Sequence, residues 1–276
     1  MKTFKLLKTA SGTAGAGRGM WGGELATFQA GFADGSSALV DADGAGATLV
    51  YASGAATVPG AAGATWKKFG IPSTPGSAGG IAFLATLDVG PGGVLSTNAK
   101  RLFFQGGSSA SVATGDAAPG LAAGNLFSAF KDPVVSPGAS AFAFAGTAKL
   151  GATATTGVWW QADGGTLQDA VATVGATYAK FASLAATDLG PVFTAKLTGA
   201  ASTADVGLWA LDSLGALRQL LREGDPLDGK TIKSFTVLTA PSGSKGVRRS
   251  YTGDGRIIVR VAFTDGSSEL VKITLP

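Results

Sequence analysis

The sequence predicts an all-β fold, a five-bladed β-propeller, from three observations. Short segments alternate large apolar residues with small or polar ones and are bounded by Gly, Pro, Asp and Ser, as strands are. Four such segments recur with a period of roughly 58 residues, which is typical of propeller blades built from four strands. The two ends of the chain carry complementary parts of one repeat. We therefore expect a single domain over residues 1–276.

Each repeat opens with a short apolar strand, which we call the opener. The five openers begin at Ala38, Arg101, Gly157, Gly207 and Ser268. Within them we take as equivalent Leu39, Leu102, Val158, Leu208 and Leu270, which gives spacings of 63, 56, 50 and 62. Strands of this length at regular intervals favour an all-β repeat protein, and no stretch keeps a helical apolar stripe for three turns.

Three further elements follow each opener. The second element ends at Gly and covers residues 48–60, 110–120, 170–178 and 217–229, with an N-terminal counterpart at 6–15. The third element carries an aromatic or apolar pair and covers residues 66–72, 126–133, 178–184 and 232–238. The fourth element is a strand after a Gly and covers residues 79–87, 139–150, 190–197 and 255–263, with an N-terminal counterpart at 23–32.

Grouping each opener with the three elements after it predicts the blades. Four blades cover about 37–98, 99–154, 155–205 and 206–267, and a closing blade combines 268–276 with 1–36. A sheet shared between the two ends closes the ring and removes exposed strand edges. The alternative is an open β-solenoid of the same repeats, which gives no reason for the ends to be complementary.

Composition excludes much of the usual chemistry of enzymes. The chain has no Cys and no His, so disulfides, thiolate catalysis, serine-type triads and nearly all zinc sites are excluded. Charged residues make up 14% and the net charge is only +4, without a dense basic stripe that would indicate nucleic-acid binding. We expect no cofactor, no metal site and no nucleic-acid partner.

Two motifs resemble a known family. The run GGIAFLATL from Gly79 and the run REGDPLDG from Arg222 are similar to the NxxGxxAF-type and REGDPAPG-type motifs of a bacterial tandem-repeat family. Parts of the second motif recur at 114–120 and 53–60. The family's members are secreted or surface-anchored, so the resemblance implies a propeller-like extracytoplasmic protein without known catalysis. The motif itself consists of turn residues, and the resemblance identifies no functional residue.

Tryptophans are the candidate ligand-binding residues. Propellers often hold sugars by stacking an aromatic ring on the sugar face. Strand alternation sends Trp159 and Trp160 to opposite sides of their sheet, so one of them is expected to be poorly buried. Trp21 and Trp66 are further candidates. The alternative is that these rings pack between blades.

Charged residues offer two weaker candidates. Lys245, Arg248 and Arg249 lie in a Gly/Ser-rich stretch and form a candidate anion-binding tip, with a solvated hairpin tip as the alternative. Glu24 and Asp188 come just before fourth-element strands and are candidates to face the propeller axis. Most other carboxylates, including equivalent turn residues at 116 and 225, lie in turn contexts, so we predict no catalytic residue.

These observations favour a non-catalytic binding or interaction scaffold whose partner is a protein or a glycan. One alternative is a lectin or a carbohydrate-active propeller enzyme. Another is a propeller that arose by duplication of a single repeat and whose sequence indicates no function beyond structural integrity. The longest strongly apolar stretch, 81–87, is far shorter than the roughly 20 residues of a membrane span, so no membrane insertion is expected. We expect a monomer, secreted or at the cell surface in its native context, with no signal peptide in this sequence.

Overall fold

The computed structural model consists mostly of β-strands joined by turns and loops. It describes residues 4–8, 26–43, 45–74, 80–105, 109–131, 133–136, 138–171, 178–237, 251–252 and 255–276. Within these residues the strands form five small antiparallel sheets, and the only helix is a three-residue 3-10 turn, η1 (Pro91–Gly93). The predicted all-β fold is confirmed.

The first two sheets each contain four strands that pair in chain order. Sheet I consists of β1 (Phe4–Lys8), β2 (Ala26–Phe32), β3 (Ser37–Asp43) and β4 (Gly46–Ala52). Sheet II consists of β5 (Trp66–Phe69), β6 (Ile81–Leu87), β7 (Lys100–Gln105) and β8 (Ser109–Ala113).

The remaining three sheets repeat this plan with small additions. Sheet III consists of β9 (Leu126–Phe130), β10 (Val134–Val135), β11 (Ala141–Leu150), β12 (Thr153–Ala162) and β13 (Gln168–Asp169), with β9 and β10 both paired to β11. Sheet IV consists of β14 (Tyr178–Thr187), β15 (Gly190–Leu197), β16 (Val206–Leu211) and β17 (Leu217–Arg222). Sheet V consists of β18 (Pro226–Leu227), β19 (Lys230–Val237), β20 (Tyr251–Thr252), β21 (Arg256–Phe263) and β22 (Ser268–Thr274).

The sheets divide the chain two strands later than predicted. Sheets II and IV each begin with a third element and continue through the fourth element, the opener and the second element. Sheet II therefore covers residues 66–113, whereas the predicted blade covers 37–98. The reason is the connections, because a fourth element and the following opener form a hairpin, such as the one between Leu150 and Thr153. A longer loop, such as 53–65, leads to the next sheet.

The predicted closing sheet, shared between 268–276 and 1–36, is wrong. β22 pairs with β21 through seven residue pairs, from Arg256↔Thr274 to Ala262↔Ser268. β1 pairs with β2 at the edge of sheet I. Each end of the chain thus pairs with a strand close to it in sequence, which requires a shorter loop to close than pairing the two ends does. The described residues form no closed ring of sheets.

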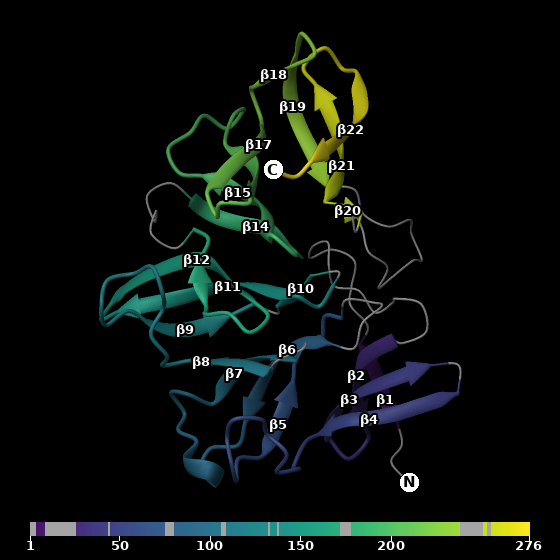
Figure 1. Cartoon of the computed structure of the whole chain (residues 1–276), viewed down its shortest axis with the longest axis vertical. Helices are drawn as coiled ribbons and strands as arrows, with labels where there is room; N and C mark the ends of the chain where they lie inside the picture. The colour runs from purple at the N-terminus through teal and green to yellow at the C-terminus, as the bar shows by residue number, and fades with distance from the viewer. Residues whose placement is uncertain are drawn as a thin grey trace.

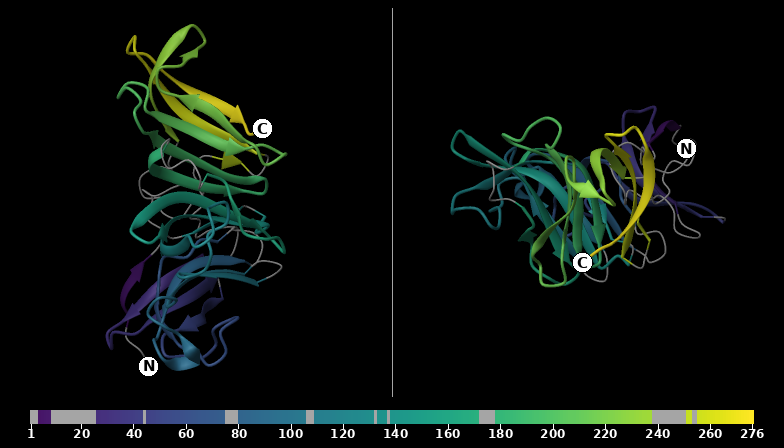
Figure 2. Two further views of the ribbon diagram at one scale, coloured as in Figure 1. Left: turned by 90° about the vertical axis from the view of Figure 1, so that its left-hand side faces the viewer. Right: turned by 90° about the horizontal axis from the view of Figure 1, so that it is seen from above.

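The five sheets follow one another in chain order along an arc, with sheet I at one end and sheet V at the other (Figure 1). A view from the side shows sheets III, IV and V one above another along the long axis, with sheets I and II together at the lower end (Figure 2). This arrangement puts each sheet face to face with its neighbours in sequence.

A hydrophobic core lies between each pair of successive sheets. Leu39 of sheet I packs with Trp66 and Phe83 of sheet II, and Leu102 of sheet II packs with Trp159 of sheet III. The next two cores join Val158 with Phe193 and Trp209, and Leu208 with Ile257 and Phe263. Strand alternation explains how one sheet serves two cores, because neighbouring residues of a strand point to opposite faces.

Polar side chains bridge the first two of these interfaces. Gln29 donates its amide N–H to the carbonyl oxygen of Phe69 at 2.7 Å, from sheet I to sheet II. The Oγ of Ser73 accepts the backbone N–H of Val135 at 3.1 Å, from sheet III to the loop after β5. Because all four groups are buried, each bond satisfies a polar group that burial would otherwise leave without a partner.

Candidate functional site

The charged segment 222–229 forms a turn that ties sheet IV to sheet V. Gly224 has φ +86°, a conformation that favours glycine, and donates its N–H to the carbonyl oxygen of Ile232 at 2.8 Å. Ile232 donates in return to the carbonyl oxygen of Asp225 at 2.9 Å. The guanidinium Nε of Arg222 donates to the carbonyl oxygen of Ala204 at 2.9 Å. The segment therefore holds the backbone of two sheets together.

The same bridge joins two other pairs of sheets. In each, a Gly with positive φ donates to the first residues of the next sheet, and the same partner residue donates back. Between sheets I and II, the N–H of Gly54 donates to the carbonyl oxygen of Trp66 at 2.6 Å, and the N–H of Trp66 donates to that of Ala55 at 3.2 Å. Between sheets II and III, the N–H of Gly115 donates to the carbonyl oxygen of Phe127 at 2.8 Å, and the N–H of Phe127 donates to that of Asp116 at 2.9 Å. Residues 116 and 225 thus occupy equivalent turns, as predicted.

Two of the four tryptophans proposed for ligand stacking belong to the core. Trp66 and Trp159 are both 0% exposed. The ring of Trp66 contacts Phe103 edge-on at 4.9 Å between centroids, and the indole N–H of Trp159 donates to the carbonyl oxygen of Pro119 at 3.1 Å. Neither ring offers a face to a ligand, which corrects the prediction for these two residues. Their sheets are covered on both faces, so large aromatic side chains fill the space between them.

Trp160 differs from its neighbour because it is only partly buried. It packs against the core between sheets III and IV, while the side chain of Gln161 donates to the carbonyl oxygen of Gly165 at 2.8 Å. Trp160 is the less buried ring of the pair, but it still packs against this core and is not a poorly buried residue. The other candidates, Trp21 and the cluster Lys245, Arg248 and Arg249, lie outside the described residues.

Asp188 lies in the turn between β14 and β15 and interacts with the neighbouring sheet. Its carboxylate accepts a hydrogen bond from the hydroxyl of Ser140 and another, at 3.4 Å, from the backbone N–H of Gly138. These bonds bridge sheets III and IV. Glu24, the second acid proposed to face the axis, lies outside the described residues.

An ion-paired cluster at one end of sheet IV was not predicted from the sequence. The Nζ of Lys196 lies 2.7 Å from the carboxylate of Asp205, which is 5% exposed. The hydrogen bond and charge of Asp205 raise the pKa of Lys196. Burial, together with the negative charge of Asp205, raises the pKa of Glu223. The cluster thus combines a paired carboxylate with a second carboxylate that ionises less readily than usual.

Sheet II has uncharged residues at the positions that correspond to this cluster. Register places Thr86, Ala99 and Thr114 of sheet II at the positions of Lys196, Asp205 and Glu223. The cluster stands out when residues at equivalent pairing positions of the sheets are compared, because sheet IV has charged residues where sheet II has Thr or Ala. Its charges are specific to sheet IV and are not part of the common plan of the sheets.

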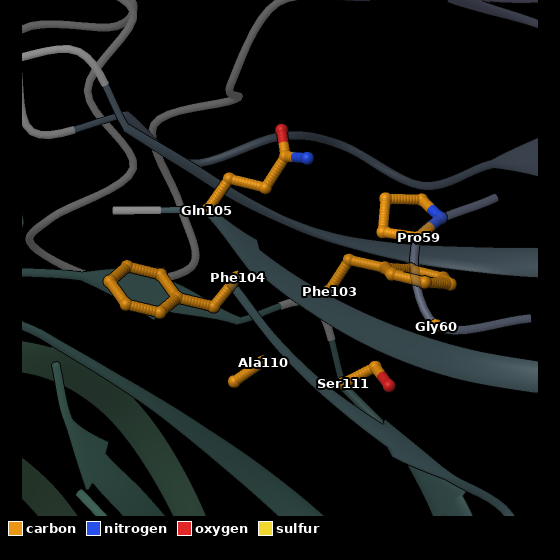
Figure 3. Close-up of a pocket in the computed structure, with 7 residues that line it drawn as sticks. All are labelled: Pro59, Gly60, Phe103, Phe104, Gln105, Ala110 and Ser111. Atoms are coloured by element: carbon orange, nitrogen blue, oxygen red, sulfur yellow. The ribbon is translucent and has the colours of Figure 1, made fainter. Parts of the chain in front are cut away.

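A small pocket of about 60 Å³ lies beside strands β7 and β8 (Figure 3). Phe103 and Phe104 point to opposite sides of β7, and Pro59 lies beside the ring of Phe103 (Figure 3). The remaining lining residues are Gly60, Gln105, Ala110 and Ser111. The volume suits a few water molecules and is well below the roughly 300 Å³ at which pockets for drug-sized ligands begin.

Comparison with known families classifies the chain. Residues 14–271 match a family of unknown function, DUF7453. The chain belongs to this family. The matched region extends through all five sheets, so membership of DUF7453 applies to the repeat array as a whole. Among curated proteins, none matches the chain.

Two other properties concern only the part of this DUF7453 protein that the structure describes. Among those residues, no helix is long and apolar enough to cross a membrane. No group of three or more carboxylates that could hold a metal ion is found among them either.

Proposed function

We propose that this DUF7453 protein is a non-catalytic repeat scaffold that binds a protein or a glycan. The observation that supports this most directly is the use of carboxylates inside hairpin turns. Asp34, Asp212 and Asp265 each accept a backbone N–H from the residue two positions later. A catalytic carboxylate must direct an oxygen at a substrate, whereas these oxygens hold their own turns.

An assay for turnover tests the absence of catalysis. The purified protein is incubated with a panel of polysaccharides and glycosides, and released reducing ends are measured. We expect none. Turnover that Glu223→Gln abolishes and Asp34→Asn preserves would contradict the scaffold and support a carbohydrate-active enzyme, because burial beside a second carboxylate raises the pKa of Glu223, as a general acid requires.

The proposal includes a propeller arrangement of the five sheets as blades. Its support is that successive sheets pack face to face in chain order, each pair around its own core. Propellers use this packing around a central axis. Small-angle X-ray scattering separates a closed disc from an open row, since an open row of sheets gives a longer maximum dimension. A profile that fits only the open row would contradict the propeller.

A carbohydrate-binding role is the second candidate, and Trp160 favours it. Its ring is partly exposed, and a flat apolar ring at the surface suits stacking on the face of a sugar. The pocket beside β7 is too small for this purpose, so the sugar would bind on the surface of sheet III.

Tryptophan fluorescence during titration with a glycan panel tests this candidate. We expect a response in the parent chain that Trp160→Phe reduces strongly. Trp66→Phe is the matched control, because the ring of Trp66 is fully buried and its replacement leaves the surface unchanged. A silent panel, or a response that survives Trp160→Phe in calorimetry, would contradict a lectin site at Trp160.

We also propose that the protein is bacterial and is secreted or displayed at the cell surface. The support is the resemblance of residues 79–87 and 222–229 to motifs of extracytoplasmic repeat proteins. The absence of Cys makes the fold independent of the redox state of its compartment. Fractionation of the source cells with an antibody against the purified chain tests the location, and recovery in the cytoplasmic fraction alone would contradict it.

A further inference from the structure

The face of sheet V that points away from sheet IV is exposed. Sheet V lies at one end of the arc, and among the described residues its core is shared with sheet IV (Figure 1). Arg260 alternates along β21 with the buried Val259 and Val261, so it points to the opposite face. Leu270 pairs with Arg260 on that face and is 68% exposed. Its equivalents in the other sheets are all 0% exposed, namely Leu39, Leu102, Val158 and Leu208.

Cations gather on this outer face, which we call the basic face. Arg260 of β21 and Lys272 of β22 are both exposed and are diagonal neighbours in the register of the two strands, about 7–8 Å apart. Lys233 of β19 is exposed at a bulge, where two residues of β19 lie opposite Ala262 of β21. The three cations therefore follow a diagonal across three neighbouring strands.

No carboxylate lies on the basic face among the described residues of its three strands. The one acid that β19, β21 and β22 contain is Glu269. Glu269 pairs with the buried Val261, which places it on the face toward sheet IV, and its carboxylate lies 2.6 Å from the Nζ of Lys230. Arg260, Lys272 and Lys233 thus share their face with no negative side chain.

Cations at the positions of Arg260 and Lys272 are specific to sheet V. In the other sheets the same two positions, defined by register, face the next sheet and hold uncharged or acidic residues. They are Gln29 and Asp41 in sheet I, Leu84 and Phe104 in sheet II, Ala145 and Trp160 in sheet III, and Thr194 and Ala210 in sheet IV. A sheet of this type is therefore built without these charges, and sheet V carries them for another reason.

We propose that the basic face binds an acidic polysaccharide, a chain whose sugars carry a carboxylate or a sulfate. This inference rests on the proposed binding function and adds the class of ligand and the surface that holds it. Arg and Lys donate charge-assisted hydrogen bonds to such oxygens, and the guanidinium of Arg260 has the planar geometry to donate two of them. A polymer with charges along its length meets the three cations one after another on the diagonal.

The uncharged residues of the basic face favour a sugar over other polyanions. Four exposed hydroxyl groups lie on it and suit the hydroxyls of a sugar, those of Ser234, Thr236, Ser268 and Thr274. The aromatic residues of β19 and β21, Phe235 and Phe263, pack in the core, so the bases of a single-stranded nucleic acid have no ring there to stack on. Leu270 alone is a smaller apolar area than the centre of a protein interface uses.

The ligand requires sheets I and V to stay apart. The face of sheet I that points away from sheet II is apolar and includes Phe32 and Val40. Contact between that face and the basic face would take Arg260 and Lys272 out of water opposite apolar groups, which is unfavourable for charges without a partner. Sheets arranged as blades with a gap between sheets I and V are compatible with the ligand.

Calorimetric titration of the full-length chain tests the proposal with pairs of ligands that differ in charge. Polygalacturonate is compared with its methyl ester, and dextran sulfate with dextran, so the two acidic ligands separate carboxylate from sulfate. Single-stranded DNA and polyglutamate represent the other polyanions. Arg260→Gln/Lys272→Gln removes two cations of the basic face, and Lys67→Gln/Lys68→Gln, which removes two exposed cations of sheet II, is the matched control. Circular dichroism checks that both variants fold.

We expect at least one acidic polysaccharide to bind, its neutral counterpart to stay silent, and the affinity to fall as NaCl is raised. Arg260→Gln/Lys272→Gln should weaken binding by about tenfold or more, and Lys67→Gln/Lys68→Gln by less than about twofold. Equal losses in the two variants would overturn the proposal, because net charge rather than the basic face would then drive binding.

Two further results would also overturn the proposal. One is that neither acidic polysaccharide binds, and the other is that DNA or polyglutamate binds more tightly than both of them. A glycan that binds at Trp160 of sheet III is detected by fluorescence and does not depend on Arg260 or Lys272. The proposed binding function can therefore stand when the acidic ligand of sheet V fails.

Discussion

The indole nitrogen of Trp159 donates a hydrogen bond to the carbonyl oxygen of Pro119, 3.1 Å away. Trp159 lies in β12 of sheet III, and Pro119 lies in the loop that follows β8 of sheet II. The ring also contacts Phe127 edge-on at 4.9 Å between centroids. One side chain thus joins apolar packing and a partly buried polar contact at the interface of two sheets.

Trp159→Phe is expected to lower the free energy of unfolding by about 2–4 kcal/mol. The substitution removes buried ring area and leaves the carbonyl oxygen of Pro119 without its donor. Trp160→Phe is the control and is expected to cost less than about 1 kcal/mol, because that ring is only partly buried. Urea unfolding curves measure both, and equal costs would contradict the central role of Trp159.

Two glycines in equivalent turns distinguish the two costs of a Gly→Ala substitution, which are the strain of a positive φ and the steric contact of the added Cβ. Gly54 and Gly224 have φ of +82° and +86°, but a Cβ at Gly54 meets open space, whereas one at Gly224 lies 3.1 Å from the Cβ of Ala204. Gly54→Ala is expected to cost about 1 kcal/mol for the conformation alone. Gly224→Ala is expected to cost more, measured by thermal unfolding. A larger loss for Gly54→Ala would show that the turn at 224 adapts to the methyl group.

Ser73→Ala tests the polar bridge between the loop after β5 and sheet III. The substitution removes the Oγ that accepts the buried N–H of Val135, so we expect a loss of about 1–3 kcal/mol. Ser36→Ala, in a turn at the surface, is the control, with an expected loss below about 1 kcal/mol. Urea unfolding measures both. Equal losses would mean that water replaces the Ser73 hydroxyl.

Asp41 and Asp212 are expected to affect the pH dependence of stability in opposite directions. Burial raises the pKa of Asp41 above its ordinary value, against a hydrogen bond from Thr27 that lowers it. The folded state then binds this proton more tightly than the unfolded state. Its contribution is complete below the ordinary pKa and is lost as pH rises through the raised value.

The pKa of Asp212 is lowered, first by the backbone N–H of Ala216 and next by a hydrogen bond from Arg218. Its contribution is present above the ordinary pKa and is lost as pH falls through the lowered value. Asp41→Asn should therefore reduce the fall in stability above pH 4, and Asp212→Asn should reduce the fall below it. Unfolding curves from pH 2.5 to pH 8 measure this, and slopes that change in the same direction would contradict the assignment.

The repeats could be identified from the sequence because strands leave a local signal. The openers and fourth elements are strands in the structure, and the turn at 222–229 has the same geometry as those near 54 and 115. The predicted blades begin two strands before the sheets of the structure. The sequence gives the order of the strands, but it does not show which connection forms a hairpin within a sheet and which leads to the next sheet. The cluster of Lys196 and Asp205 was missed because its partners are brought together only by pairing.

The sequence by itself determined that this protein is built from strands of a recurring type, with little charge and without the side chains that most catalysis uses. Alternation and turn residues act over a few positions, so they can be seen in the chain before it folds. The tertiary structure decided which tryptophans are buried and which strand each end pairs with. These depend on the neighbouring sheet and on chain ends far apart in sequence, as the contrast between buried Leu208 and exposed Leu270 demonstrates.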